Sequence, residues 1–350
     1  MQIQIFLIHY EANEQENKGT VILDATCAPQ NISFPQDTHL LNECREKLEG
    51  VIDYICETNS LEKPRTYRRE AYKDFLNIAR SRKRTAVKIR KAIRKQLQYI
   101  RRDFSYIDEY LLHGYTLKPK QDRLLCVLRT LYLQQKTMYE EKTHSVSDRI
   151  VSISQPYIRP IVRGKASATV EFGAKLDISI VNGFAKIEKL SFDAYNESEV
   201  LQIAVNNYHE KYGCYPQKVL ADKIYRNRDN LSFCKLHGIR LSGPSLGRPK
   251  KDAEVDKKEE YRDNCDRVEV ERAFSLAKRS YGLGLIRTRL EETTKHAIAL
   301  SILAMNLNKV SLCQILYSVL KLYKTKIQMI YRKDFRNISK IYGLAVLATC

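Results

Sequence analysis

Apolar and polar positions alternate with different periods along the chain, and these periods predict its secondary structure. Short apolar runs of strand length lie at residues 20–24, 218–222 and 239–243. Residues 166–187 alternate β-branched and polar positions around Gly173, which predicts two paired strands. Apolar residues at steps of three or four predict helices at residues 38–58, 196–211, 227–237, 265–281 and 292–324.

The longest helical pattern runs from about residue 65 to residue 113. Residues 113–120 interrupt it, and residues 121–141 have the pattern of a returning helix, so a helical hairpin is expected after the first strand. One part of this hairpin carries many cations and no acid. These cations are Arg80, Arg82, Lys83, Arg84, Lys88, Arg90, Lys91, Arg94, Lys95, Arg101 and Arg102.

The order of elements predicts the fold class. Without the helical insertion, strands and helices follow as β-β-β-α-β-α-β-α, which is typical of an α/β protein with a mixed sheet flanked by helices. We expect a core formed by residues 1–37 and 151–312, interrupted by a helical insertion at 38–150. Residues 243–260 have the glycine, proline and mixed charge of a linker, and residues 313–350 are expected to form a C-terminal helical tail.

Charge and composition narrow the function classes. Lys and Arg number 60 against 41 Asp and Glu, and the net charge of +19 favours a polyanionic partner, either nucleic acid or an acidic membrane face. No apolar run approaches the roughly 20 residues of a spanning helix. The nine Cys form no C-x-x-C pair, which favours reduced thiols in a cytoplasmic protein over disulfides or a zinc site. The phosphate-loop motif of nucleotide-binding proteins is missing, so no nucleotide is expected.

Three acidic residues lie where strands or helices could bring them together. Asp24 and Asp222 each close a short apolar run, and Glu271 lies on the helix after the last strand, on one face with Arg267 and Lys278. Three converging carboxylates repel one another unless a cation lies between them. Oxygen ligands suit Mg²⁺ or Mn²⁺. Two such ions can activate a water or a DNA 3′-hydroxyl and stabilise the leaving oxygen of a phosphoryl transfer.

These acids also have structural interpretations. Asp222 could be a turn or helix-cap residue. Asp37 is a competitor for the role of Asp24. Glu269 competes with Glu271, although its helical position faces away from the neighbouring cations.

The basic and aromatic neighbours of these acids leave alternatives open as well. Arg267 and Lys278 could form ion pairs with Glu271 or contact DNA phosphates. Tyr225 and Arg226 follow Asp222 and could steady a cut DNA end or pack within the loop.

Four segments carry a resemblance to a known family: "VILDATCAPQNISFPQD", "ISQPYIRPIVRGKASATVEFGAKL", "VLADKIYRNRDNLSFCKLHGIRLSG" and "RVEVERAFSLAKRSYGL". Together they resemble the DDE transposases of bacterial insertion sequences over roughly residues 18–312. The resemblance implies a ribonuclease-H-like catalytic core in which Asp24, Asp222 and Glu271 are catalytic and bind two Mg²⁺ or Mn²⁺ ions. It also implies cleavage of transposon ends and strand transfer into target DNA, usually by a homodimer.

A second family pattern, Tyr-x2-Arg-x3-Glu-x6-Lys, matches in part. Arg267, Glu271 and Lys278 have its spacing, and Asn264 stands at its first position. Relatives usually carry a helical DNA-binding domain before the first catalytic strand, whereas about twenty residues precede that strand here. A truncated, catalytically inactive DNA-binding remnant and a general structure-specific nuclease therefore remain alternatives.

The basic part of the helical insertion is expected to bind DNA. Like charges four residues apart destabilise a helix, and a polyanion relieves that repulsion. The alternative is a solvated helix face. Phosphate contacts would position the protein without reading sequence, in a cytoplasmic, nucleoid-associated protein. The expected contacts are Arg82, Lys83, Arg84, Lys88, Arg90, Lys91, Arg94 and Lys95.

Overall fold

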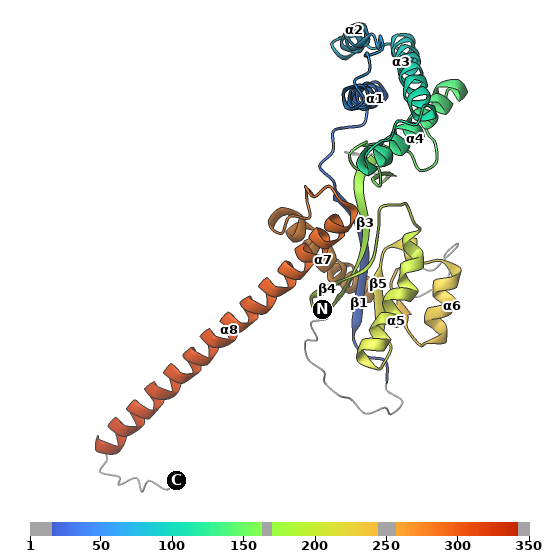
Figure 1. The fold of residues 1–350 in the computed structure, drawn as a ribbon. Coiled ribbons are helices and arrows are strands. Elements are labelled where there is room, and N and C mark those ends of the chain that lie inside the picture. The colour runs from blue at the N-terminus through green and yellow to red at the C-terminus, as the bar shows by residue number, and fades with distance from the viewer. Residues whose placement is uncertain (1–15, 163–169, 244–256, 342–350) are drawn as a thin grey trace.

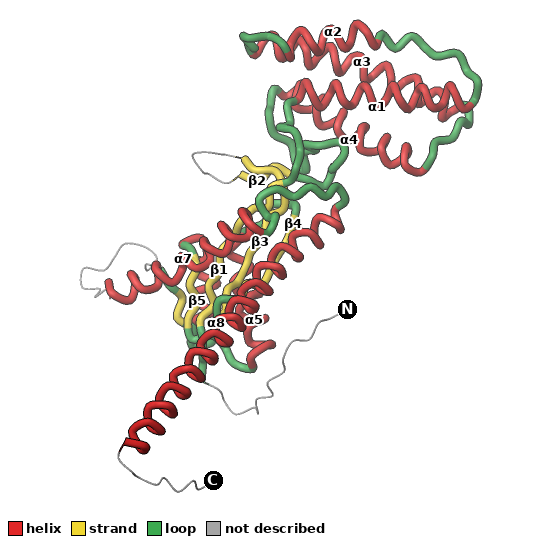
Figure 2. Tube along the Cα trace, turned by 90° about the vertical axis from the view of Figure 1, so that its left-hand side faces the viewer, coloured by secondary structure: helices red, strands yellow, loops and turns green. Residues whose placement is uncertain are grey.

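The computed structural model describes residues 16–162, 170–243 and 257–341. A central sheet lies between two layers of helices, with α7 and α8 on one face and α5 and α6 on the other (Figure 1). A group of four helices, α1 to α4, lies beyond one end of the strands, and α8 extends past the other end (Figure 2). The mixed α/β class expected from the order of elements is confirmed.

The sheet has six strands, and β1 lies at its centre. β1 pairs antiparallel with β3 and parallel with β5, and β5 pairs parallel with β6. β2 and β4 both pair antiparallel with β3, on the edge that β1 leaves free. The strands are β1 (Thr20–Pro29), β2 (Arg159–Val162), β3 (Val170–Val181), β4 (Phe184–Ser191), β5 (Lys218–Ala221) and β6 (Arg240–Leu241).

One strand boundary differs from the expectation. β1 does not end at Asp24 but continues to Pro29, because its last residues pair with the first half of β3. The two paired strands expected within residues 166–187 are present as β3 and β4. β3 runs through Gly173, and the chain turns at Asn182 and Gly183, which have positive φ angles. A Cβ at position 173 would lie 2.1 Å from the carbonyl oxygen of Ala28. Gly173 therefore allows a close approach of two strands.

α7 begins earlier than expected, at Lys257 inside the expected linker, and α8 continues past residue 324 to Ile341. Otherwise the helices follow the expected positions with one exception. They are α1 (Asp37–Thr58), α2 (Arg68–Ala79), α3 (Ala86–Leu112), α4 (Pro119–Glu141), α5 (Val200–Tyr212), α6 (Arg228–Leu236), α7 (Lys257–Ser280) and α8 (Glu291–Ile341). Two short 3₁₀ turns, η1 (Glu197–Glu199) and η2 (Lys223–Tyr225), precede α5 and α6. The expected linker falls largely on residues 244–256, outside the described residues.

The exception is the long helix expected from residue 65 to residue 113, which is two helices, α2 and α3. The side chain of Thr85 accepts a hydrogen bond from the Lys88 amide at 3.4 Å and caps α3. Arg84 donates to the carbonyl oxygen of Ala79 at 2.6 Å, which closes the turn between the helices. Local side-chain bonds thus compete with a continuous helix, and the expected hairpin is part of a four-helix group.

Three apolar clusters form the interior. Ile22, Ile178 and Leu220 of the sheet pack with α7 and α8. Val21 and Leu23 point to the other face and pack with α5 and α6. The third cluster lies among α1, α3 and α4. Since alternate residues of a strand point to opposite faces, these clusters fix the direction of every polar side chain between them.

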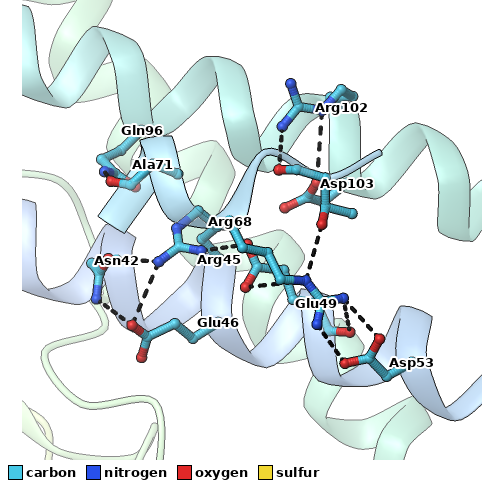
Figure 3. A network of polar contacts seen from close by, with 11 residues as sticks. Asn42, Arg45, Glu46, Glu49, Asp53, Arg68, Ala71, Gln96, Arg102 and Asp103 are labelled. Carbon is cyan, nitrogen blue, oxygen red and sulfur yellow. Dashed lines mark hydrogen bonds and ion pairs between the residues drawn. The ribbon is translucent and has the colours of Figure 1, made fainter. Parts of the chain in front are cut away.

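A buried polar network crosses the four-helix group (Figure 3). Arg45, only 1% exposed, pairs with Glu49 in the next turn of α1. Arg68 binds Asp53 with two hydrogen bonds, of 2.7 and 2.8 Å. Asp103 is fully buried, and neither of its carboxylate oxygens has a hydrogen-bond partner among the residues that the structure describes. Buried groups of this kind are expensive.

None of the helices in the described ranges combines the length and apolar character needed to cross a membrane.

Candidate active site

Asp24 and Asp222 lie side by side at the point where β5 ends. The parallel register pairs Leu23 with Ala221, so the next residue of each chain segment is one of the two aspartates. Neighbouring strands are about 4.8 Å apart. Asp222 still has an extended backbone, and its carboxylate accepts the Lys223 amide at 2.7 Å, which caps η2. The expected meeting of these two acids is therefore present in the sheet.

Both aspartates point to the face that α7 covers. Asp24 lies two residues after Ile22, and Asp222 lies two residues after Leu220. Ile22 and Leu220 belong to the same buried apolar cluster as Val270 of α7. Because side chains two residues apart share one face of a strand, the two carboxylates lie on the face of the sheet that α7 covers, with the Asp222 side chain 55% exposed at the end of its strand.

The environment of Asp24 disfavours its negative charge. Burial raises the pKa of this carboxyl to about 6, and the charges of Asp222 and Glu197 raise it further, against the Ala25 amide and the Arg267 guanidinium, which lower it. The Ala25 amide donates to the Asp24 carboxylate at 2.8 Å. A desolvated carboxylate facing a second one has the chemistry of a ligand for a hard divalent cation.

Arg267 is the cation of the site. Its guanidinium lies 3.9 Å from the Asp222 carboxylate. The start of α7 is held to the sheet edge by Arg240 of β6, which binds the buried Asp263 with two hydrogen bonds of 2.7 and 2.8 Å. This bidentate pair fixes the helix that carries Arg267.

Glu271 is on the same helix but is not brought into contact with the two aspartates. It is exposed and lies four residues after Arg267, about 6 Å further along the helix axis. Glu269 instead approaches Lys309 of α8 at 3.6 Å. Among the residues that the structure describes, no group of three acidic, His or Cys side chains is arranged to hold a metal. Two acids of the expected trio lie side by side, and the third is one helical turn from the nearby arginine.

Lys278 lies at the end of α7, away from the aspartates. It lines an open cavity of about 660 Å³ together with Arg279 and Arg287. Gly284 lies on the same cavity, where a Cβ would come within 2.6 Å of the Lys278 carbonyl oxygen. The cavity is therefore cationic and backbone-lined.

Tyr225 and Arg226 have structural partners. Tyr225 is fully buried, and its hydroxyl donates to the carboxylate of Asp177. Arg226 donates to the carbonyl oxygens of Leu241 and Ser242 at 2.6 and 2.8 Å, which ties the loop to β6. In this arrangement the buried Tyr225 ring is not accessible to a nucleotide. The contacts of both residues agree with the alternative that they pack within the loop.

Asp177 was not among the sequence candidates. It is fully buried in the middle of β3, beside Ala25 of β1, and also accepts a hydrogen bond from Tyr195. Its signal in the sequence is an acid between Leu176 and Ile178 in an apolar strand. Asp37, the competitor of Asp24, lies at the start of α1 and pairs with Arg149 at 2.6 Å.

The basic candidates of the helical group divide into two sets. Three have partners: Arg84 at the α2–α3 turn, Lys95 with Asp74 at 2.7 Å, and Arg90 over the Tyr139 ring at 4.1 Å. The others are exposed, and no side-chain partner is found for them in the described residues. These are Arg82, Lys83, Lys88, Lys91 and Arg94.

The chain is thus an α/β protein with a pair of carboxylates beside a helix that supplies an arginine. Residues 219–308 match the family model described as the transposase DDE domain. The match runs from β5 through Asp222 and α7 into α8, and the expected resemblance to DDE transposases is confirmed by it. No curated protein and no solved structure matches the chain.

Proposed function

We propose that this protein is a DNA transposase that cleaves transposon ends and transfers them into target DNA. The observation that carries this proposal is the parallel register of β1 and β5, which sets Asp24 beside Asp222 in a chain with a transposase DDE domain match. The proposal includes a ribonuclease-H-like core. The strand order β4-β3-β1-β5-β6, with β3 antiparallel to its neighbours, supports it.

In this proposal Asp24, Asp222 and Glu271 are the catalytic acids and hold two Mg²⁺ or Mn²⁺ ions. When bound, the ions would supply an activated water or 3′-hydroxyl and stabilise the leaving oxygen. The raised pKa of Asp24, caused mainly by burial and also by the charge of Asp222, supports a cation at this place, because a cation would stabilise the charged form of the carboxyl. Arg267 balances the charge of the Asp222 carboxylate. Once a bound metal ion neutralises that carboxylate, the Arg267 guanidinium would be able to contact a DNA phosphate.

The DNA backbone is proposed to follow the exposed cations. Exposed cations lie on and just after the α2–α3 turn: Arg82, Lys83, Lys88, Lys91 and Arg94. The cationic cavity at Lys278 offers a second contact. We also keep the proposed division into the interrupted core (1–37 and 151–312), insertion (38–150) and tail (313–350), and a cytoplasmic, nucleoid-associated location.

A homodimer on DNA is the proposed assembly, and α8 supports it. Ile298, Ile302 and Met305 of this helix pack on the sheet. The same helical stripe continues past the body of the protein with large apolar residues, each more than half exposed, where α8 projects alone (Figure 1). These residues are Leu312, Leu316, Val319 and Tyr323. Association should be lost in Leu316→Glu and kept in Ser311→Glu, as measured by analytical ultracentrifugation.

The test of the catalytic proposal is nicking of duplexes that carry the ends of the element's own DNA, with Mg²⁺ or Mn²⁺. Asp222→Asn and Asp24→Asn should each lower the rate of nicking by at least about 100-fold, since each removes a carboxylate that helps to stabilise the transition state. Asp229→Asn, an exposed acid seven residues after Asp222, is the matched control and should cut normally. Glu271→Gln is compared in the same way with Glu269→Gln. Normal cutting by Asp222→Asn would overturn the assignment.

The DNA-contact proposal has its own test. A triple change of Lys88, Lys91 and Arg94 to Gln should lower the salt dependence of DNA affinity by roughly 0.9 per lost phosphate contact. Changing Lys120 and Arg123 of α4 to Gln is the control on another exposed surface. An unchanged salt slope in the triple variant would remove this surface from the proposal.

A DNA-binding protein without catalysis is the second candidate. The lack of a three-acid cluster among the described residues favours it. Salt-dependent DNA binding without nicking of element ends, in both Mg²⁺ and Mn²⁺, would favour it over the transposase.

A further inference from the structure

A buried carboxylate lies directly behind the proposed catalytic pair, on the opposite face of the sheet. Asp177 is fully buried and accepts hydrogen bonds from two tyrosine hydroxyls, those of Tyr225 and Tyr195. It pairs with Ala25, the residue after Asp24, in the β1–β3 register. Asp177 therefore touches the elements that carry the site without facing the site itself.

The two tyrosines come from different segments. Tyr225 ends η2, only three residues after Asp222, and its amide donates to the Asp222 carbonyl oxygen at 3.0 Å. The side chain of the buried Asn230 donates to the Tyr225 carbonyl oxygen at 2.8 Å. Tyr195 comes from the loop before η1 and is not connected to Asp222 along the chain. Only the Tyr225 bond therefore reaches the turn that presents the Asp222 carboxylate.

Burying a charged side chain in the interior of the sheet costs desolvation free energy. Burial raises the pKa of Asp177, and the two tyrosine hydroxyls lower it. An apolar side chain would fill the same space without desolvating a charge. What a carboxylate adds is direction, because its bond to a tyrosine hydroxyl fixes the position of that ring. Precise active sites depend on neighbouring side chains that fix the conformation of the active residues by packing and hydrogen bonds.

We propose that Asp177 and Tyr225 are positioning residues that fix the η2 turn and thereby aim Asp222 at Asp24. They touch neither substrate nor cation. This inference rests on the proposed function for its effect on catalysis, but the fixing of the turn stands on the structure alone.

The test compares two matched variants, Tyr225→Phe and Tyr195→Phe. Each removes one hydroxyl from the same carboxylate, and only the first loosens the turn after Asp222. We expect Tyr225→Phe to lower kcat for nicking about 10-fold with little change in KM for DNA. It should also weaken Mn²⁺ binding about 10-fold, measured by electron paramagnetic resonance on the DNA-free protein. Tyr195→Phe should leave both within about 2-fold of the unchanged protein.

Amide hydrogen exchange supplies a readout that needs neither cation nor activity. The Tyr225 and Arg226 amides bond to the carbonyl oxygens of Asp222 and Lys223. Their exchange should speed up in Tyr225→Phe and stay unchanged in Tyr195→Phe. Equal exchange in the two variants, or equal nicking and Mn²⁺ affinity, overturns the proposal.

The two proposals fail in different ways. If the unchanged protein neither nicks DNA nor binds Mn²⁺, the transposase proposal fails, while the exchange comparison still decides whether Tyr225 fixes the turn. If Tyr225→Phe does not fold, Asp177→Asn provides the second variant, since its amide oxygen keeps one acceptor. It should show a selective loss of Mn²⁺ affinity, and full Mn²⁺ affinity with unchanged exchange would overturn the proposal.

Discussion

The sheet and the four-helix group each bury a carboxylate completely, and they treat it differently. Asp177 of β3 accepts two tyrosine hydroxyls. Asp103 of α3 has no hydrogen-bond donor on either oxygen within the described part of the chain, and the Arg102 guanidinium lies 3.9 Å away (Figure 3). Burial and the charge of Glu49 raise the pKa of Asp103 to about 7.

The difference shows two ways to keep an acid in a protein interior. Burial raises the pKa of Asp177, and its two tyrosine donors oppose that shift, so the carboxylate can serve as a fixed anchor. Asp103 escapes the penalty by holding a proton instead. A bonded carboxylate specifies geometry, whereas a protonated one makes stability depend on pH. The helical group should therefore respond to pH near neutrality, and the interior of the sheet should respond to loss of hydrogen bonds.

The largest expected effect is the pH dependence that Asp103 gives to the four-helix group. Its pKa is about 7 in the folded chain and 3.8 when unperturbed, so between these values the folded state binds the extra proton. Stability is then highest at low pH and falls as pH rises to about 7, by up to about 4 kcal/mol. Asp103→Asn should remove this fall and stabilise the protein at pH 8, measured by urea unfolding.

Below about pH 3 the Asp103→Asn variant should match the unchanged protein, because Asp103 is then mostly protonated in both the folded and the unfolded state. A variant less stable than the unchanged protein at pH 8 would contradict the prediction and show that the charge of Asp103 is paired in solution.

The same substitution in the sheet should have the opposite sign. Asp177→Asn replaces two charge-assisted hydrogen bonds by weaker neutral ones, which costs about 2 kcal/mol. The measurement is urea unfolding at pH 8, beside Asp103→Asn. If both variants gain stability, the tyrosine bonds do not offset the desolvation of Asp177, and the contrast between the two regions fails.

The parts of this contrast that the sequence predicts are those with local signals. Asp24 and Asp222 each follow a short apolar run, and parallel pairing of those runs was enough to place them together. Strand alternation put Asp177 on the face opposite Ile178, but whether water or α5 and η2 cover that face depends on contacts distant in the chain. Asp103 shares a helix face with Ile100 and Ile107, which signals burial yet not the missing donors.

The position of Glu271 shows a further limit. Its helix and spacing are readable from the pattern, but its distance to the aspartates depends on the rotation and tilt of α7. Those are set by the packing of Val270 and Phe274 and by the Arg240–Asp263 pair. Residues 80–85 interrupt a pattern that remains helical in period, because the capping bonds of Thr85 and Arg84 outweigh the periodicity.

A smaller effect is expected at Asp24, which is neither hydrogen-bonded as fully as Asp177 nor buried as completely as Asp103. It has one amide donor and a facing carboxylate, and its folded pKa of about 6 exceeds the unperturbed 3.8. The folded state thus loses stability as pH rises from about 4 to 6. Without divalent ions, Asp24→Asn should gain about 1 kcal/mol at pH 8, part of the full linkage because the group is half-buried.

Divalent ions should reverse that order. Mn²⁺ at 100 times its dissociation constant should stabilise the unchanged protein by about 2.7 kcal/mol, and Asp24→Asn should gain far less. The readout is the melting temperature with Mn²⁺ and after removal of the ion by a chelator. An equal response of the two proteins would exclude Asp24 as a ligand.

The smallest effect is expected at Asp53, an acid that is stabilised in a third way, by a partly exposed ion pair with Arg68. Hydrogen bonds from Arg68 hold the pKa of Asp53 below its usual value. This pair therefore contributes stability above the unfolded pKa of about 4 and loses it as pH falls below that. Because Arg68 is 38% exposed, Asp53→Asn should cost less than about 1 kcal/mol at pH 7.

The loss of stability in Asp53→Asn should shrink at pH 3 and in 1 M salt, measured by urea unfolding. A loss that persists in both conditions would mean that Asp53 acts through packing, and that partial exposure does not distinguish it from the fully buried acids of either region.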